Sequence, residues 1–278
     1  MSARKRIGFL GTGKMGTALA SGFVRGGFCR PDDVVAYNRS PERARNFAVE
    51  TGCDVVDSPD RVVEAAETLI VAVKPRAVTG LLDSIASLVD DTHLVVSVAA
   101  GCSLAKMRAS LGGGRRIVRV MPNTPCLVAE GATVFATGPH ATEADAERVT
   151  EMFATVGVVE RVDETLIDAV TGLSGSGPAY VFEFVEALVD GAVRMGLPRE
   201  TAHSLAVQTV VGAGRMLAET GEIPAELKNQ VASPGGTTMA ALFELDRCGS
   251  HAAVMTAVEA ATKRSAELGL ELSRHRSE

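Results

Sequence analysis

Residues 233–238 bring together residue types that can bind a small anion. They read Ser-Pro-Gly-Gly-Thr-Thr and are followed by an apolar helical pattern over residues 239–245. Successive glycines leave backbone N–H groups free to point at one negative group, and a helix start adds a favourable dipole worth about 0.3–1 kcal/mol. The alternative role of such Ser and Thr residues is to cap the helix. We expect a carboxylate-binding loop at the entrance of a buried helix, formed by Ser233, Gly235, Gly236, Thr237 and Thr238.

A glycine-rich turn near the N-terminus is typical of dinucleotide binding. Gly11, Gly13 and Gly16 form a G-x-G-x-x-G pattern directly after a strand-like run. In this motif the first glycine permits a tight turn, the second lets the backbone approach a pyrophosphate, and the third lets the helix pack closely. The next helix presents free N–H groups to the phosphates, although a merely tight strand–helix turn is the structural alternative. The predicted cofactor-binding residues here are Leu10, Gly11, Thr12, Gly13, Lys14, Met15 and Gly16.

The end of the second predicted strand favours NADP(H) over NAD(H). Sites that prefer NAD commonly carry Asp or Glu there to bond the ribose 2′-hydroxyl. This chain has Asn38, Arg39 and Ser40 instead. Arg39 can pair with a 2′-phosphate, and Asn38 and Ser40 can donate hydrogen bonds to it. We therefore expect NADPH as the cofactor, with NADH less preferred.

Further loops belong to the nucleotide site by their position after predicted strands. In an open parallel sheet, ligands bind beyond the carboxyl ends of the strands. Residues 71–75 and 97–101 end two such strands. Lys74 is either a catalytic cation or, as we favour, a loop residue near a phosphate or ribose. The residues predicted to contact the cofactor are Ala72, Val73, Lys74, Pro75, Ala99 and Ala100, together with Asn123 in a stiff loop between two prolines.

The elements that must position these residues change in type along the chain. Up to residue 163, short Val- and Ile-rich runs alternate with helical patterns, which is typical of a parallel, doubly wound sheet buried on both faces. From residue 164 to 278 the patterns are helical, with small residues at close intervals in 211–214. We expect a Rossmann-type α/β domain over residues 1–163, followed by an all-α dimerisation and substrate-binding domain over residues 164–278. The clearest predicted strands are residues 6–11, 33–38, 68–75, 93–101 and 116–123.

Composition excludes several classes of function. The 278 residues carry a net charge of -6 and no Trp, which argues against nucleic acid as a partner. We find no apolar run near the roughly 20 residues of a membrane helix and no apolar core of a signal peptide. The five cysteines are scattered and odd in number, and the five histidines lack ligand spacing. We therefore expect a cytoplasmic protein with no disulfide framework, no metal and no membrane association.

Five motifs together carry a family resemblance. They are GFLGTGKMGTALA at residues 8–20, VAVKP at 71–75, VRVMPNTP at 118–125, TGLSGSGPAY at 171–180 and LKNQVASPGGTTMAAL at 227–242. The first two occur in many dehydrogenases, whereas the last is highly specific. With these motifs the chain resembles the Δ1-pyrroline-5-carboxylate reductase family over nearly its whole length.

The resemblance implies reduction of the cyclic imine of pyrroline-5-carboxylate to L-proline by NADPH or NADH. It also implies that chains intertwine as homodimers through the helical domain, and that dimers assemble into decamers in some members. In the family, the active site lies between the nucleotide domain of one chain and the helical domain of its mate. Within that site we predict Thr238 as the catalytic residue, whose hydroxyl orients and polarises the ring nitrogen and relays a proton from water.

Two departures from the family pattern limit what is carried over. Residues 57–62 lack the Asn that commonly contacts the cofactor, and Gln230 stands where an Asn is common. The alternatives are another cyclic imine reductase, a β-hydroxyacid dehydrogenase, or a non-enzymatic nucleotide sensor. A β-hydroxyacid dehydrogenase would need a Lys in its second-domain helix and an Asp-Ala-Pro-Val-Ser-Gly-Gly stretch, which this sequence lacks. An intact 233–238 loop disfavours a pure nucleotide sensor.

Overall fold

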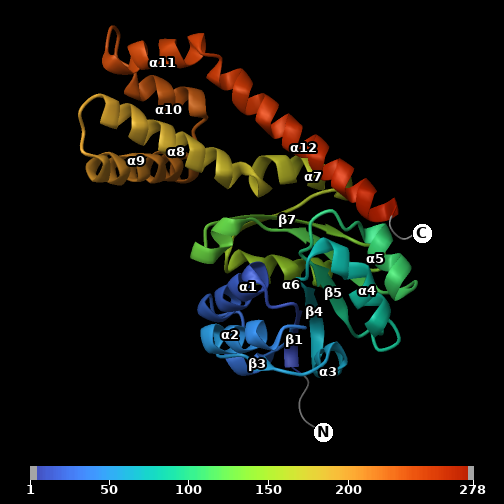
Figure 1. The fold of residues 1–278 in the computed structure, drawn as a ribbon. Coiled ribbons are helices and arrows are strands. Elements are labelled where there is room, and N and C mark those ends of the chain that lie inside the picture. Colours follow the sequence, from blue (N-terminus) through green and yellow to red (C-terminus); the bar gives the residue numbers. More distant parts are fainter. Residues whose placement is uncertain (1–4, 275–278) are drawn as a thin grey trace. The chain divides into compact units, whose positions relative to one another are not determined.

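The computed structural model describes residues 5–274 and divides them into two compact units. Unit 1 runs to Gly175 and resumes at Ala260, and unit 2 is Ser176–Glu259. The expected boundary after residue 163 falls earlier than this division. One helix, α12 (Ser250–Arg274), begins in unit 2 and ends in unit 1 (Figure 1). The last part of the chain therefore belongs to the same compact unit as its beginning.

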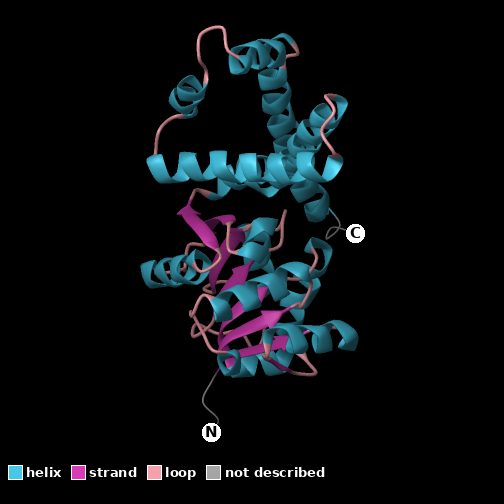
Figure 2. Cartoon of the chain, turned by 90° about the vertical axis from the view of Figure 1, so that its left-hand side faces the viewer, coloured by secondary structure: helices cyan, strands magenta, loops and turns pink. Residues whose placement is uncertain are grey.

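The strands of unit 1, coloured magenta in Figure 2, form one sheet. Within residues 5–274 this sheet has eight strands in the order β3-β2-β1-β4-β5-β6-β7-β8. The expected Rossmann-type fold class with a parallel sheet is thus confirmed, and the described sheet departs from parallel pairing at β7, which runs antiparallel to β6. The link between these strands contains a short 3-10 turn, Thr124–Val128. A parallel return needs a crossover of about a dozen residues or more, so this shorter link suits an antiparallel pair. The strands are β1 (Lys5–Leu10), β2 (Val34–Tyr37), β3 (Asp54–Val55), β4 (Ala66–Val71), β5 (Leu94–Ser97), β6 (Arg116–Met121), β7 (Gly131–Thr137) and β8 (Gly157–Arg161).

Helices cover both faces of the sheet, and successive residues of β1 supply the two cores. Phe9 lies in the core under α1, α2 and α6, where Phe23 packs beside it with a ring-centroid distance of 6.1 Å. Leu10 lies in the core on the other face, with Leu82 and Met107 from α4 and α5. The helices of unit 1 are α1 (Lys14–Arg25), α2 (Pro41–Thr51), α3 (Pro59–Ala65), α4 (Pro75–Ile85), α5 (Leu104–Leu111), α6 (Glu143–Ala154) and α7 (Ile167–Val170).

Several strands end earlier than the sequence predicts, so residues of the candidate site that were expected at strand ends lie in loops. β4 ends at Val71 and β5 ends at Ser97. Residues 72–74 and 98–103 are therefore loops beyond the strand ends, rather than parts of the strands. Pro75 opens α4, in keeping with the preference of proline for the first turn of a helix.

Unit 2 consists of helices and loops and buries few side chains in the single chain. Its core contains Val189, Ala202 and Ala206, with partly buried neighbours from α8. The expected burial of α11 is wrong for the single chain, since none of its residues is buried and Phe243 is 66% exposed. Gly212 also faces open space, so α9 makes no close helix contact at that position within the chain. The helices are α8 (Gly177–Arg194), α9 (Arg199–Thr220), α10 (Pro224–Val231) and α11 (Thr237–Arg247), followed by the start of α12.

Candidate active site

The glycine-rich turn after β1 has the geometry that its sequence predicts. Gly11 has φ +110°, and a Cβ there would come within 2.7 Å of the Ala72 carbonyl oxygen. A Cβ on Gly16 would come within 2.4 Å of the Gly11 carbonyl oxygen, so α1 begins tightly against the turn. By contrast, a Cβ on Gly13 would meet nothing within 4 Å. The first and third glycines are thus needed by the fold, whereas the second borders open space.

The polar groups of this turn fit a dinucleotide. Gly13 is the N-cap of α1 and supplies no side-chain cap, so the first N–H groups of that helix have no side-chain acceptor at the cap. The Thr12 hydroxyl is buried without a hydrogen-bond partner. An uncapped helix start and an unpartnered buried hydroxyl are what the phosphates of a dinucleotide would satisfy. Residues 10–16 are therefore suited to hold the pyrophosphate of NADP(H).

The tip after β2 holds Asn38, Arg39 and Ser40 together. The Asn38 side-chain oxygen accepts a hydrogen bond from the Ser40 amide at 2.9 Å. The Ser40 hydroxyl caps α2 by accepting from the Arg43 amide at 3.5 Å, which leaves its own hydrogen free to donate. Arg39 is exposed, so its guanidinium is accessible to an anion. This arrangement can bind a 2′-phosphate.

The loops after β4 and β5 lie beside the same edge of the sheet. The Ala72 amide donates to the Leu10 carbonyl at 2.9 Å, and the Val98 amide donates to the Val71 carbonyl at 3.1 Å. Lys74 is the N-cap of α4 but makes no side-chain cap bond. Ala99 is buried, and Ala100 is exposed. The predicted contacts on these loops therefore lie near the glycine-rich turn through the β1–β4–β5 pairing.

Both ends of the Asn123 side-chain amide form hydrogen bonds within the protein. Its Nδ2 donates to the Ser174 carbonyl at 2.9 Å, and its Oδ1 accepts from the Ala132 amide at 2.8 Å. Ser174 lies in a π-helical segment, Thr171–Gly175, of the kind often found at functional sites. A nearby Cβ on Gly175 would come within 2.9 Å of Met121 Cε. Asn123 therefore fixes the loop after β6, and only one of its amide hydrogens remains for a ligand.

The 233–238 loop lies in unit 2 and does not use its hydroxyls to cap α11. Gly236 is the N-cap, and no side-chain cap bond is present. The Gly236 amide donates to the Ser233 carbonyl at 3.0 Å, and Gly235 has φ +69°. A Cβ on Gly236 would come within 2.3 Å of the Ser233 hydroxyl oxygen. The capping alternative is thus wrong, and the start of α11 is left available to an anion.

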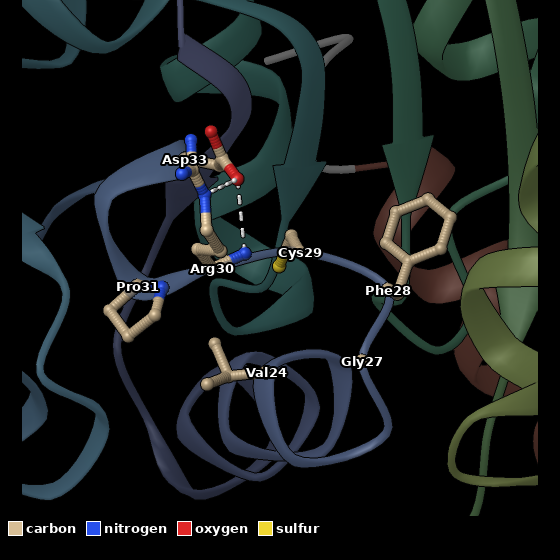
Figure 3. Close-up of a pocket in the computed structure, with 7 residues that line it drawn as sticks. All are labelled: Val24, Gly27, Phe28, Cys29, Arg30, Pro31 and Asp33. Carbon is tan, nitrogen blue, oxygen red and sulfur yellow. Dashed lines mark hydrogen bonds and ion pairs between the residues drawn. The ribbon is translucent and has the colours of Figure 1, made fainter.

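One surface pocket lies away from these loops. It is lined by the segment that joins α1 to β2, where Arg30 and Asp33 are linked by an ion pair at 3.4 Å (Figure 3). That segment precedes β2, so the pocket lies at the opposite end of the strands from the residues that follow them. Because ligands of such sheets bind beyond the carboxyl ends, this pocket is not part of the candidate site.

No group of His, Cys, Asp and Glu side chains suited to a metal ion occurs among residues 5–274. No disulfide joins cysteines among the described residues, where Cys248 is exposed and Cys29, Cys53, Cys102 and Cys126 are buried. For the described residues, no helix has both the length and the apolar character that crossing a bilayer requires. Burial raises the pKa of the Cys102 and Cys126 thiols, which disfavours their thiolate forms.

The sheet order, the turn and the tip after β2 define unit 1 as the nucleotide-binding unit of a Rossmann-type NAD(P)-dependent oxidoreductase. A family model described as NADP oxidoreductase, coenzyme F420-dependent, matches residues 6–101. A second model, described as pyrroline-5-carboxylate reductase dimerisation, matches residues 164–268. The region that buries few side chains in the single chain is therefore a dimerisation domain.

Relatives extend the match to almost the whole chain. The pyrroline-5-carboxylate reductases of Methanosarcina acetivorans and Arabidopsis thaliana are 42% and 44% identical over 95% of this chain, covering 98% and 95% of those proteins. The structure of Plasmodium falciparum pyrroline carboxylate reductase with NADP bound has a TM-score of 0.86 at 31% identity, covering 96% of this chain and 100% of that one. The Coxiella burnetii enzyme gives a TM-score of 0.90 at 33% identity, with coverages of 95% and 98%. The chain belongs to the pyrroline-5-carboxylate reductase family, and the family and enzyme class expected from its sequence are confirmed.

Proposed function

We propose that the protein reduces the C=N bond of pyrroline-5-carboxylate with NADPH to give L-proline. One observation carries this proposal: a single chain holds both the open glycine-rich turn and a second glycine-rich loop, residues 233–238, whose helix has no side-chain cap. The first suits the phosphates of a nicotinamide cofactor, and the second suits the carboxylate of a small substrate. Members of the family at more than 40% identity support the choice of substrate.

When bound, the dihydronicotinamide supplies a hydride to the imine carbon. The nitrogen gains a proton, so that the C=N double bond becomes a C–N single bond with hydrogen on both atoms. The protein has little acid–base chemistry to perform, because a protonated imine is already a good hydride acceptor. Its main contribution is to hold the two reactants in the correct relative position, which can lower the activation free energy by up to roughly 7–11 kcal/mol.

The 233–238 loop is the proposed substrate site. The Gly235 amide and the Ser233 and Thr237 hydroxyls bind the carboxylate. Gly236, whose own amide is held by the Ser233 carbonyl, lets the carboxylate approach the start of α11. Thr238 is the proposed catalytic residue. Its hydroxyl is too weak an acid to protonate the ring nitrogen by itself, so it orients and polarises that nitrogen and passes on a proton from water.

The cofactor site is proposed along the carboxyl ends of β1, β2, β4, β5 and β6. Arg39 pairs with the 2′-phosphate while Asn38 and Ser40 donate to it, which favours NADPH over NADH. The phosphates lie at the uncapped start of α1. The remaining contacts are proposed from Ala72, Val73, Lys74, Pro75, Ala99, Ala100 and Asn123.

The working enzyme is proposed to be a homodimer, or a higher oligomer such as a decamer built from dimers. The apolar side chains exposed on the helices of unit 2 support association, because Phe182, Phe243 and Met255 are each more than 60% exposed in the single chain. In the dimer, the 233–238 loop of one chain serves the nucleotide unit of its partner. Cysteines that form no disulfide among the described residues support a cytoplasmic location.

The test is a direct assay of the purified protein with pyrroline-5-carboxylate and NADPH, following loss of NADPH absorbance and formation of proline. We expect turnover with NADPH and slower turnover with NADH. Oxidation of a 3-hydroxy acid without any reduction of the imine would instead assign the protein to the β-hydroxyacid dehydrogenases. Cofactor binding without turnover of either substrate would indicate a nucleotide sensor.

A further inference from the structure

The loop between β5 and α5, residues 98–103, carries two of the proposed cofactor contacts but has few means of fixing its own position. It reads Val-Ala-Ala-Gly-Cys-Ser, and Gly101 has φ +70°. The Ser97 hydroxyl accepts from the Ala99 amide at 3.4 Å, and the Ser103 hydroxyl caps α5. Between these two points the side chains offer no long polar group. The loop therefore depends on neighbouring elements for its geometry.

Glu164 holds the far end of this loop. Its Oε1 accepts a hydrogen bond from the Leu104 amide at 2.7 Å. Leu104 is the first residue of α5, where the amide has no acceptor within the helix. The same oxygen accepts from Arg119 Nη1 at 3.0 Å. Since Arg119 is paired across the sheet with Ser97, one carboxylate joins both ends of the loop.

Arg119 makes this carboxylate costly to replace. The arginine is 8% exposed, whereas the Glu164 side chain is 30% exposed. A guanidinium so deeply buried needs a hydrogen-bonded counter-charge, and hydrogen bonds between charged groups are shorter and stronger than neutral ones. Glu164 thus serves at once as counter-charge to a buried arginine and as acceptor for a helix amide.

The C-terminal part of α12 supports the same region. The Ser265 hydroxyl donates to Asp168 Oδ1 at 2.7 Å, which fixes α12 to α7 four residues beyond Glu164. Further along α12, a Cβ on Gly269 would lie 3.7 Å from the Gly101 carbonyl oxygen, an ordinary contact distance. The loop is therefore bounded by Glu164 at one end and by α12 at its glycine.

We propose that Glu164 is a positioning residue for hydride transfer, which sets the place of the 98–103 loop through the Leu104 amide and Arg119. This inference rests on the proposed function, in which Ala99 and Ala100 contact the cofactor. Glu164 touches neither reactant and acts through the loop. A shift of about 1 Å at the reacting centre can lower the rate roughly 100-fold. Loss of the support that Glu164 gives the loop should therefore lower the rate of hydride transfer measurably.

The first experiment compares Glu164→Ala and Glu164→Gln with Glu143→Ala as the matched control. Glu143 also pairs with an arginine, Arg161 at 2.7 Å, but on an exposed surface. The readout is the single-turnover rate of NADPH oxidation per bound NADPH at saturating pyrroline-5-carboxylate. We expect Glu164→Ala to slow it about tenfold or more, because the loop loses its anchor, and Glu164→Gln to restore much of it through the amide oxygen. A rate per bound NADPH equal to that of wild type in Glu164→Ala would overturn the inference.

The second experiment isolates the contribution of the Leu104 amide hydrogen by comparing two variants. Leu104→Pro deletes the donor at a helix position that accepts proline, after Ser103 with φ −73° and ψ 156°, a conformation suited to the residue before proline. Leu104→Ala is the control, since it also loses the buried leucine side chain but keeps the N–H. We expect the proline variant to have the slower single-turnover rate, and equal rates in the two variants would contradict the role of this bond.

A measurement on the free protein completes the test without any turnover. Hydrogen–deuterium exchange of peptides covering residues 98–104 should be faster in Glu164→Ala than in wild type, and unchanged in Glu143→Ala. Exchange at the wild-type rate in Glu164→Ala would show that the loop does not depend on Glu164. Failure of the proposed function would appear separately, as wild-type protein that does not reduce pyrroline-5-carboxylate at all.

Discussion

The side-chain amide of Asn123 donates a 2.9 Å hydrogen bond to the backbone carbonyl of Ser174, which joins the loop after β6 to the π-helical segment. The other end of the amide accepts from Ala132 at the start of β7, and Asn123 is only 7% exposed. One side chain therefore holds three segments of unit 1 in register.

Replacing Asn123 by Ala should lower the free energy of unfolding of unit 1. The Ser174 carbonyl and the Ala132 amide would lose their partner, and an unsatisfied buried group costs about 1–3 kcal/mol. Denaturant unfolding of Asn123→Ala, compared with exposed Asn46→Ala on α2, measures this effect. Equal stability of the two variants would show that water replaces both bonds without cost.

Replacing Arg39 by Ala should weaken binding of NADPH far more than binding of NADH. A hydrogen bond to a charged group contributes about 1.5–3 kcal/mol, so the NADPH dissociation constant should rise at least about tenfold. Fluorescence titration with both cofactors measures the difference, with exposed Arg45→Ala on α2 as the control. If both cofactors lose affinity alike, Arg39 does not contact a 2′-phosphate.

Replacing Thr238 by Ala should lower kcat more than it changes the NADPH dissociation constant. The hydroxyl is expected to act on the imine nitrogen and not on the cofactor, and a tenfold loss corresponds to about 1.4 kcal/mol of transition-state stabilisation. Steady-state kinetics of Thr238→Ala and Thr238→Ser provide the measurement, and serine should retain most of the rate. For comparison, Thr237→Ala should mainly raise the KM for pyrroline-5-carboxylate. Parallel losses of turnover and cofactor affinity in Thr238→Ala would make the residue structural.

The turn before β5 should contribute stability that disappears in strong acid. The Thr92 hydroxyl, 2.6 Å from Asp90 Oδ1, is the largest of several causes that lower the pKa of Asp90 from 3.8 to about 2, and the His93 ring also contacts this carboxylate. Because the folded pKa is lower than the unfolded one, the stabilisation is complete above pH 3.8 and is lost as the pH falls through about 2.

Thr92→Val tests this pH dependence. Its deficit in unfolding free energy should be largest near neutral pH and should shrink as the pH falls through about 2, because only below that pH is the carboxyl largely protonated in both states. Thr150→Val is the control, since that hydroxyl donates to a backbone carbonyl and not to a carboxylate. A Thr92→Val deficit that stays constant with pH would contradict the assignment.

Features that depend on local chemistry could be predicted from the sequence. The turn at Gly11 could be predicted because its positive φ is a requirement that glycine meets without strain. Pro178 at the start of α8 is a similar local preference. The antiparallel direction of β7 could not be predicted, because it depends on the path that the short connection from β6 takes in three dimensions.

The supporting contacts of the candidate site carry no local signal. Asn123 and Ser174 are 51 residues apart, and Glu164 and Leu104 are 60 apart, so no spacing rule relates them. The exposure of α11 could not be predicted from the sequence for a different reason. An apolar helical pattern shows that a face must be covered, but it does not say whether the cover comes from the same chain or from another one.

The scarcity of buried side chains in Ser176–Glu259 links the stability of this region to the amount of protein present. Unit 1 buries both faces of its sheet within one chain, so its unfolding does not depend on dilution. A region completed by a second chain obeys mass action, and its midpoint of unfolding rises with concentration. In the proposed dimer, dilution should therefore melt the helical region first and remove the proposed substrate loop, while the nucleotide unit still binds its cofactor.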